Sequence, residues 1–149
     1  MVSRRFFWLK LATVAQALTA SFHVLSFFNQ PKPINETEAK LFELMSSYKF
    51  DLGVGFHRSM NDLMNAFSIS FTLLLVFSFL LNLFLLRNKI ASQLMKGVIL
   101  ISTLVYFVCF ISMACLTFLP PIICTGIIVV ALLLSYWELR KEIHLKNEK

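Results

Sequence analysis

Four residues whose side chains can take part in acid–base chemistry or ion pairing are placed where they could meet. His57, Arg58 and Asp62 come directly before the uncharged stretch Leu63–Leu86. Arg58 and Asp62 are four residues apart, so in a helix that begins near His57 they would share one face and could pair. His23 lies near the end of an earlier apolar stretch. If both apolar stretches cross a membrane, His23 lies at a depth similar to that of His57, Arg58 and Asp62. Their shared depth therefore predicts that the side chains of His23, His57, Arg58 and Asp62 lie close together.

Polar side chains continue from this group into the apolar stretch. Asn61, Asn65, Ser68 and Thr72 follow one another at spacings of four, three and four residues, which places them on one face of a helix. Asn82 extends this polar stripe towards the other end of the stretch. Polar groups within lipid must find partners or face the interior of the protein. We therefore expect the stripe to be either packed in the protein or used in binding.

Two interpretations of these residues are open. In the structural one, Arg58 and Asp62 fix the start of a helix, and the amides bond to neighbouring backbone. In the functional one, they form a site for a lipid headgroup or a small ligand. The residues assigned to that site are His23, His57, Arg58, Asn61, Asn65 and Asp62. An enzyme acting on a lipid or quinone is the alternative, with His23 or His57 as acid or base and Arg58 holding an anion.

The other chemically active residue types give no further site. Cys109, Cys115 and Cys124 have no C-x-x-C spacing and so lack a pair for thiol–disulfide exchange. Two histidines near one membrane boundary are weak support for haem, which needs opposed axial ligands. There is no glycine-rich phosphate loop and no carboxylate deep within an apolar stretch, which argues against a proton-coupled pump. We expect no metal and no cofactor.

The composition indicates that these residues are carried by membrane-spanning helices. Of the 149 residues, 58% are hydrophobic and 15% are charged. A soluble domain averages roughly 45–50% apolar and about 25% charged residues. A soluble globule of this length has too little interior to bury the excess, so much of it must face lipid. This excludes a soluble enzyme and predicts an all-α integral membrane protein.

The lengths of the apolar stretches predict four spans. A bilayer core of about 30 Å takes roughly 20 apolar residues as a helix. Gly97–Trp137 has no charged side chain and is about twice that length, and Pro120–Pro121 stands where a helical hairpin must turn. Lys10 interrupts the first stretch but can extend its ammonium back to the headgroups. We predict one domain, residues 1–149, with spans at about 6–28, 63–86, 97–119 and 120–137.

The distribution of charge predicts the orientation. The flanks on the side of both termini carry ten basic and three acidic residues, whereas residues 29–62 carry four basic and five acidic ones. A basic excess in short flanks marks the cytoplasmic side. Both termini are therefore expected inside, with residues 29–62 outside. The basic balance then reflects topology and contact with anionic lipid headgroups, and we expect no nucleic-acid partner.

The N-terminus and the outer segment need separate interpretation. Ala15-Gln16-Ala17 has the form of a signal-peptide cleavage site, but Lys10 within the apolar region and hydrophobicity up to Phe28 favour a retained span. In the outer segment, Asn35 is followed three residues later by Glu38, the spacing of a helix capping box. We expect a short amphipathic helix there, on the outer membrane face or capping the bundle.

One part of this pattern resembles a known family. Gly55, Arg58, Ser59 and Asp62 form a Gly-x-x-Arg-Ser-x-x-Asp motif before the second helix, with His23 in the first helix and Phe67-Ser68 following. The stretch from Phe50 to Leu81 resembles a family of small, uncharacterised bacterial four-helix inner-membrane proteins. Ala66 stands in place of an expected glycine, and Leu63-Met64 in place of an aromatic pair. The resemblance implies a bacterial inner-membrane location and that His23, Arg58 and Asp62 act together, but no activity.

The sequence thus predicts a four-span transmembrane helical bundle without an assigned activity. Non-enzymatic roles are favoured: binding a lipid or a small apolar ligand, or acting as a subunit of a membrane assembly. A partner would be another membrane protein or further copies of the chain. A small channel built by such copies would need the polar stripe to line a central axis.

Overall fold

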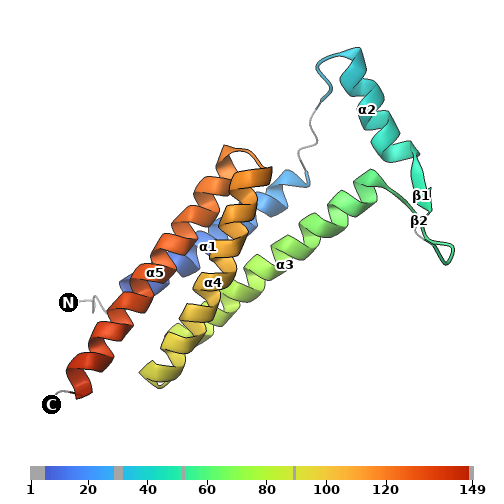
Figure 1. The fold of residues 1–149 in the computed structure, drawn as a ribbon. Helices are drawn as coiled ribbons and strands as arrows, with labels where there is room; N and C mark the ends of the chain where they lie inside the picture. Colours follow the sequence, from blue (N-terminus) through green and yellow to red (C-terminus); the bar gives the residue numbers. More distant parts are fainter. Residues whose placement is uncertain (1–5, 29–31, 52, 89, 148–149) are drawn as a thin grey trace. The chain divides into compact units, whose positions relative to one another are not determined.

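The computed structural model describes residues 6–28, 32–51, 53–88 and 90–147. Within them the chain forms five helices and one two-stranded hairpin (Figure 1). The elements run α1 (Phe7–Ser26), α2 (Glu36–Ser47), β1 (Lys49–Asp51), β2 (His57–Ser59), α3 (Met60–Arg87), α4 (Ser92–Leu116) and α5 (Leu119–Asn147). The predicted helical class is confirmed. The chain divides into a helical unit, up to Ala20 and from Leu75 onwards, and a hairpin unit, Ser21–Leu74.

Three helices in the described part of the chain are long and apolar enough to cross a membrane. They are α3, α4 and α5, and they correspond to the predicted spans at 63–86, 97–119 and 120–137. The 20-residue α1 is not among them. Many large apolar side chains on these helices are exposed, such as Phe77 on α3 and Leu104 on α4. Such exposure is expected where side chains face lipid.

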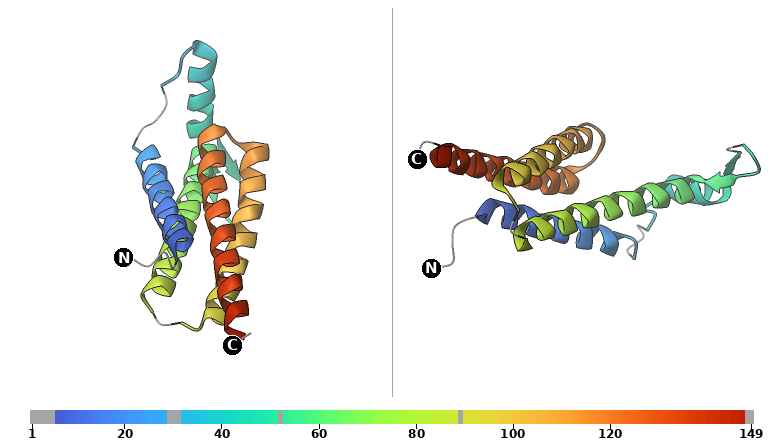
Figure 2. Two further views of the ribbon diagram at one scale, coloured as in Figure 1. Left: turned by 90° about the vertical axis from the view of Figure 1, so that its left-hand side faces the viewer. Right: turned by 90° about the horizontal axis from the view of Figure 1, so that it is seen from below.

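In the helical unit, α4 and α5 form the hairpin that the prolines predicted and lie side by side (Figure 2). The Thr117 N–H closes the end of α4 by donating to the Met113 carbonyl at 3.0 Å. Pro120 and Pro121 fall in the first turn of α5. In that turn a backbone N–H has no partner within the helix, so proline loses nothing there.

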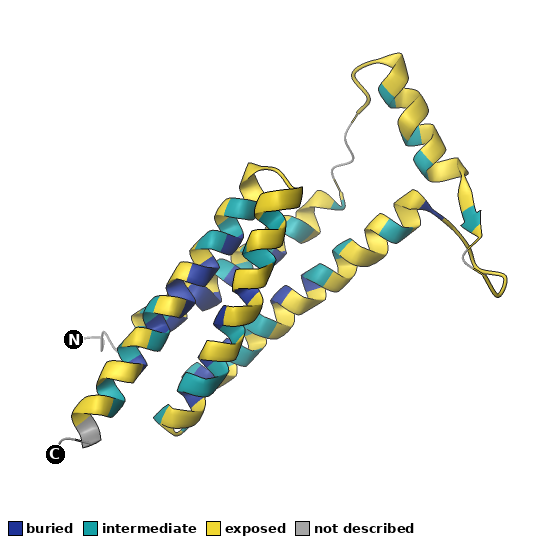
Figure 3. Ribbon diagram, in the orientation of Figure 1, coloured by how far each residue is buried: buried dark blue, intermediate teal, exposed yellow. Residues whose placement is uncertain are grey.

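The core of the helical unit receives side chains from four helices. Leu9 of α1, Ile99 of α4 and Leu132 of α5 are completely buried, and Leu85 of α3 is nearly so. The buried positions form stripes along the helices, and the opposite faces are exposed (Figure 3). The apolar excess in the composition therefore lies both in this core and on the surface.

In the hairpin unit, α2 begins at the predicted cap. The Asn35 side chain accepts a hydrogen bond from the Glu38 N–H at 2.9 Å, and the Glu38 carboxylate accepts one from the Ile34 N–H. These reciprocal bonds satisfy donors that have no partner within the helix. No residue of α2 is buried (Figure 3), so packing against the described chain contributes little to its stability.

A tight turn after α2 decides where Arg58 lies. Gly53, Val54 and Gly55 all have positive φ, of 84°, 52° and 81°, a conformation that glycine adopts without strain. The turn pairs β1 with β2, placing Phe50 opposite Arg58. Arg58 is therefore on a strand, because the extended pairing continues to Ser59 and α3 begins only at Met60. The expectation of a helix beginning near His57 was wrong.

Candidate functional site

Ser59 and Asp62 fix the start of α3. The Ser59 Oγ accepts a hydrogen bond from the Asp62 N–H at 3.2 Å, and the Asp62 Oδ2 accepts one from the Ser59 N–H at 2.9 Å. This reciprocal pair is a capping box and satisfies two backbone donors at the helix start. No hydrogen bond or ion pair joins the side chains of Arg58 and Asp62, both of which are described. The structural role expected of an Arg58–Asp62 pair is thus performed by Ser59 and Asp62.

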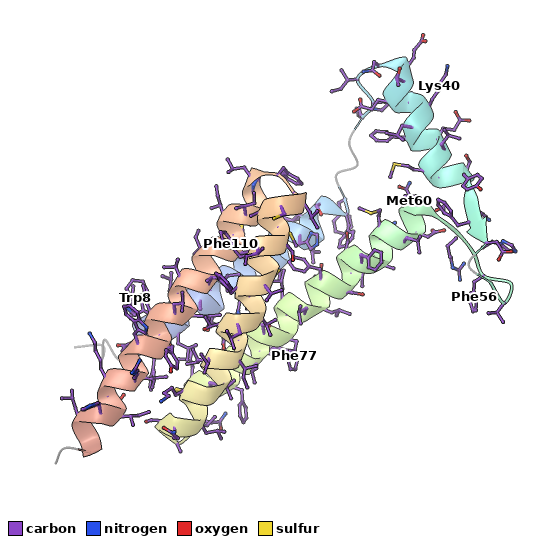
Figure 4. The ribbon with its side chains drawn as sticks, viewed as in Figure 1. Trp8, Lys40, Phe56, Met60, Phe77 and Phe110 are labelled. Carbon is purple, nitrogen blue, oxygen red and sulfur yellow. The ribbon has the colours of Figure 1, made fainter. Side chains whose placement is uncertain are left out.

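Arg58 and Asp62 nevertheless line one cavity. It has a volume of about 220 Å³, and among the described residues Leu63 and Ala66 also line it. The guanidinium carbon of Arg58 lies 5.9 Å from the ring centroid of Phe56, within cation–π range. Phe56 itself is exposed in the hairpin turn, at the opposite end of β2 from Met60 (Figure 4). The cavity therefore combines a cation, an anion and an apolar wall.

His23 does not join this cavity. Its ring packs edge-on against Phe71 with the centroids 5.3 Å apart, and lies 5.9 Å from the ring of Phe27. Phe71 is nine residues beyond Asp62, which is about 13 Å along a helix. The predicted convergence of His23 with Arg58 and Asp62 is therefore not found, and His23 serves as a half-buried aromatic contact.

The other predicted site residues, His57, Asn61 and Asn65, are not among the residues that line this cavity. His57 is exposed on β2, opposite Asp51. The Asn61 amide donates to the Ser46 Oγ at 2.8 Å, which ties the start of α3 to the end of α2. Asn65 is exposed on α3. Of the six predicted residues, the structure brings only Arg58 and Asp62 into one cavity.

A second set of polar side chains lies inside the helical unit. The sequence did not predict that these side chains come together. The Asn82 amide of α3 donates to the Gln16 Oε1 of α1 at 2.9 Å, and both residues are at most 1% exposed. The Tyr106 hydroxyl of α4 lies beside Gln16 and Ser78. Neither that hydroxyl nor the Gln16 Nε2 has a hydrogen-bond partner within the described chain. We name Gln16, Asn82 and Tyr106 the buried polar group.

The described residues contain no group of three or more His, Cys, Asp or Glu side chains that could hold a metal ion. Cys109, Cys115 and Cys124 are free thiols.

Comparison with known proteins gives no match to a protein-family model, to a curated protein or to a solved structure.

The capping box gives a first prediction. Ser59→Ala is expected to lower the free energy of unfolding by about 1 kcal/mol, because the Asp62 N–H loses its acceptor. Thermal unfolding in detergent, followed by circular dichroism, measures the change. Ser70→Ala is the matched control, because the exposed Ser70 hydroxyl only bonds back to the Ala66 carbonyl of its own helix. Equal effects of the two variants would contradict the capping role.

Proposed function

We propose that the protein is a multi-pass membrane protein that binds a phospholipid through a zwitterionic headgroup. In this proposal α1 is a fourth span, with Lys10 extended to the headgroups, and the four spans form a bundle. Both termini are cytoplasmic, and residues 29–62, including α2, lie outside. The charge distribution supports this orientation. The resemblance around Arg58 and Asp62 supports a bacterial inner-membrane location.

The observation that carries the proposal is the cavity shared by Arg58 and Asp62. A zwitterionic headgroup presents a phosphate and an ammonium group separated by two carbons. A guanidinium binds phosphate through two parallel N–H donors. The Asp62 carboxylate uses Oδ2 for the helix cap, and its other oxygen can accept from an ammonium group. Each charge in the cavity thus has a complementary charge on the headgroup.

The neighbourhood of the cavity suits a lipid better than a free solute. Leu63 and Ala66 provide its apolar wall. Along the next turns of α3, Met64 and Phe67 are exposed, at 53% and 71%. The charges thus stand at the start of a helix whose following residues offer apolar surface to acyl chains. Such an arrangement is typical of the boundary between headgroups and hydrocarbon.

The enzyme alternative has less support. It requires His23 or His57 as acid or base beside the Arg58 guanidinium. His23 packs on Phe71, and His57 is exposed on β2. A binding role needs only the pair of charges that the cavity contains, and we therefore favour binding.

The test is retention of phosphatidylethanolamine by the purified full chain, measured by native mass spectrometry. Arg58→Gln is expected to weaken binding about ten-fold or more, because a charge-assisted hydrogen bond contributes roughly 1.5–3 kcal/mol. Asp62→Asn should reduce the preference for phosphatidylethanolamine over phosphatidylglycerol, which lacks the ammonium group. Lys40→Gln, which removes an exposed cation from α2, is the matched control. Wild-type retention by Arg58→Gln would overturn the proposal.

A further inference from the structure

The end of α5 carries a second cavity, built from residues that the proposed function does not use. Its volume is about 460 Å³, and its lining is Trp137, Arg140, Lys141, His144 and Leu145. These five residues follow spacings of three, one, three and one, so they occupy a single face of the helix. We name this face the basic face of α5.

The length of α5 places this face at a membrane boundary. From Leu119 to Leu139 the helix is about 30 Å long, the thickness of a hydrocarbon core. Leu139 is 1% exposed and ends the run of buried apolar positions on α5. Arg140 and the residues after it therefore lie at headgroup level. Trp137 is 59% exposed one turn earlier, as expected of an interfacial tryptophan.

Two of the side chains on the basic face carry a permanent positive charge. Arg140 and Lys141 are both exposed and line the cavity, and His144 stands one turn further along. The nearest carboxylates on the helix are Glu138 and Glu142, which are four residues apart and are not part of the cavity lining. The basic face therefore offers two permanent cations to one ligand, and none of the described residues that line the cavity is a carboxylate.

We propose that the basic face of α5 binds the headgroup of an anionic phospholipid in the leaflet where α5 ends. Phosphate is the anion for which arginine and lysine together are suited, since arginine binds it through two donors and lysine as a point charge. Trp137 and Leu145, both exposed at opposite ends of the same face, provide apolar surface for the glycerol and upper acyl region. This combination selects a lipid over free phosphate, which has no apolar part. The site is separate from the cavity at Arg58 and does not depend on it.

Trp137 provides a direct reporter of this binding. The sequence has two tryptophans, so Trp8→Phe leaves Trp137 as the only one. In detergent, this background is titrated with phosphatidylglycerol or phosphatidylcholine carrying the same brominated acyl chains, which quench nearby tryptophan. Phosphatidylglycerol is expected to quench at a concentration about 30-fold lower, because Arg140 and Lys141 each contribute about 1 kcal/mol towards an anionic lipid.

Paired variants identify the residues responsible. Arg140→Gln with Lys141→Gln should bring the two lipids to within about two-fold of each other. Lys40→Gln with Lys49→Gln removes the same charge from α2 and β1 and should keep the full preference. Both double variants change exposed side chains, and circular dichroism checks that they fold. Equal quenching by the two lipids, or an unchanged preference without Arg140 and Lys141, would overturn the proposal. So would release of the lipid by millimolar inorganic phosphate, which would identify a site for free anions.

Discussion

Asn82→Leu is expected to lower the free energy of unfolding by about 1–3 kcal/mol, because it leaves the buried Gln16 amide without its donor. The two amides meet at 2.9 Å between α1 and α3, at positions that are at most 1% exposed. A buried polar group without a partner loses its hydration without compensation, and within a membrane no water replaces the lost bond. Unfolding in detergent by titration with sodium dodecyl sulfate measures the change.

A double-mutant cycle separates the hydrogen bond from other effects of the substitution. Gln16→Leu should also destabilise, while the Gln16→Leu/Asn82→Leu pair should cost less than the sum of the two single changes. The expected coupling is about 0.5–1.5 kcal/mol, in the range found for interhelical hydrogen bonds in membranes.

Asn65→Leu is the matched control for this cycle. It makes the same substitution on the same helix at an exposed amide, and should change stability by no more than about 0.5 kcal/mol. If Asn82→Leu and Asn65→Leu behave alike, or if the cycle shows no coupling, the buried polar group does not hold α1 and α3 together.

The features that the sequence predicted are those set by local rules. The hairpin of α4 and α5 follows from the length of an uncharged stretch and from Pro120–Pro121, which cannot continue a helix from the preceding residue. The cap of α2 follows from two side chains, Asn35 and Glu38, three residues apart. In both cases the residues that decide the structure are neighbours in sequence, so no tertiary contact has to be known.

The position of Arg58 depends on where α3 begins. A spacing of four residues to Asp62 indicates a pair only if both are helical, and helix starts are set by caps. Ser59 and Asp62 have the same three-residue spacing as Asn35 and Glu38, so the capping box at α3 was present in the sequence. This capping box starts the helix at Met60 and leaves Arg58 outside it.

The partners of His23 and of Asn82 could not be derived in this way. Residue counting places His23 and Asp62 at the same membrane depth. Depth alone does not determine which face of one helix packs against which neighbouring helix. The structure places Phe71 beside His23 and Gln16 beside Asn82. Both contacts join α1 to α3 and link residues more than 45 positions apart in the sequence. They depend on how each helix is rotated about its own axis, and the polar stripe on one helix does not determine that rotation.

A tight contact between α4 and α5 at Gly126 gives the other large effect. A Cβ atom at this position would lie 3.2 Å from the Cε2 of Phe110, closer than carbon atoms normally pack. Phe110 stands on α4, facing this turn of α5 (Figure 4). Glycine thus allows the two helices to approach, as small residues commonly do between membrane helices.

Because of this contact, Gly126→Leu is expected to be about 1–3 kcal/mol less stable than Gly97→Leu, the usual cost of forcing extra carbon atoms into a packed interface. Gly97→Leu on α4 is the matched control, because a Cβ there has no neighbour within 4 Å. Both changes gain the same helix propensity, roughly 0.8–1 kcal/mol, so the difference between the variants isolates the contact with Phe110. Unfolding in sodium dodecyl sulfate measures both.

Combining Gly126→Leu with Phe110→Ala should restore part of the loss, because the smaller side chain makes room for the leucine. Equal stability of the Gly126 and Gly97 variants would mean that α4 and α5 do not approach as closely as this contact requires.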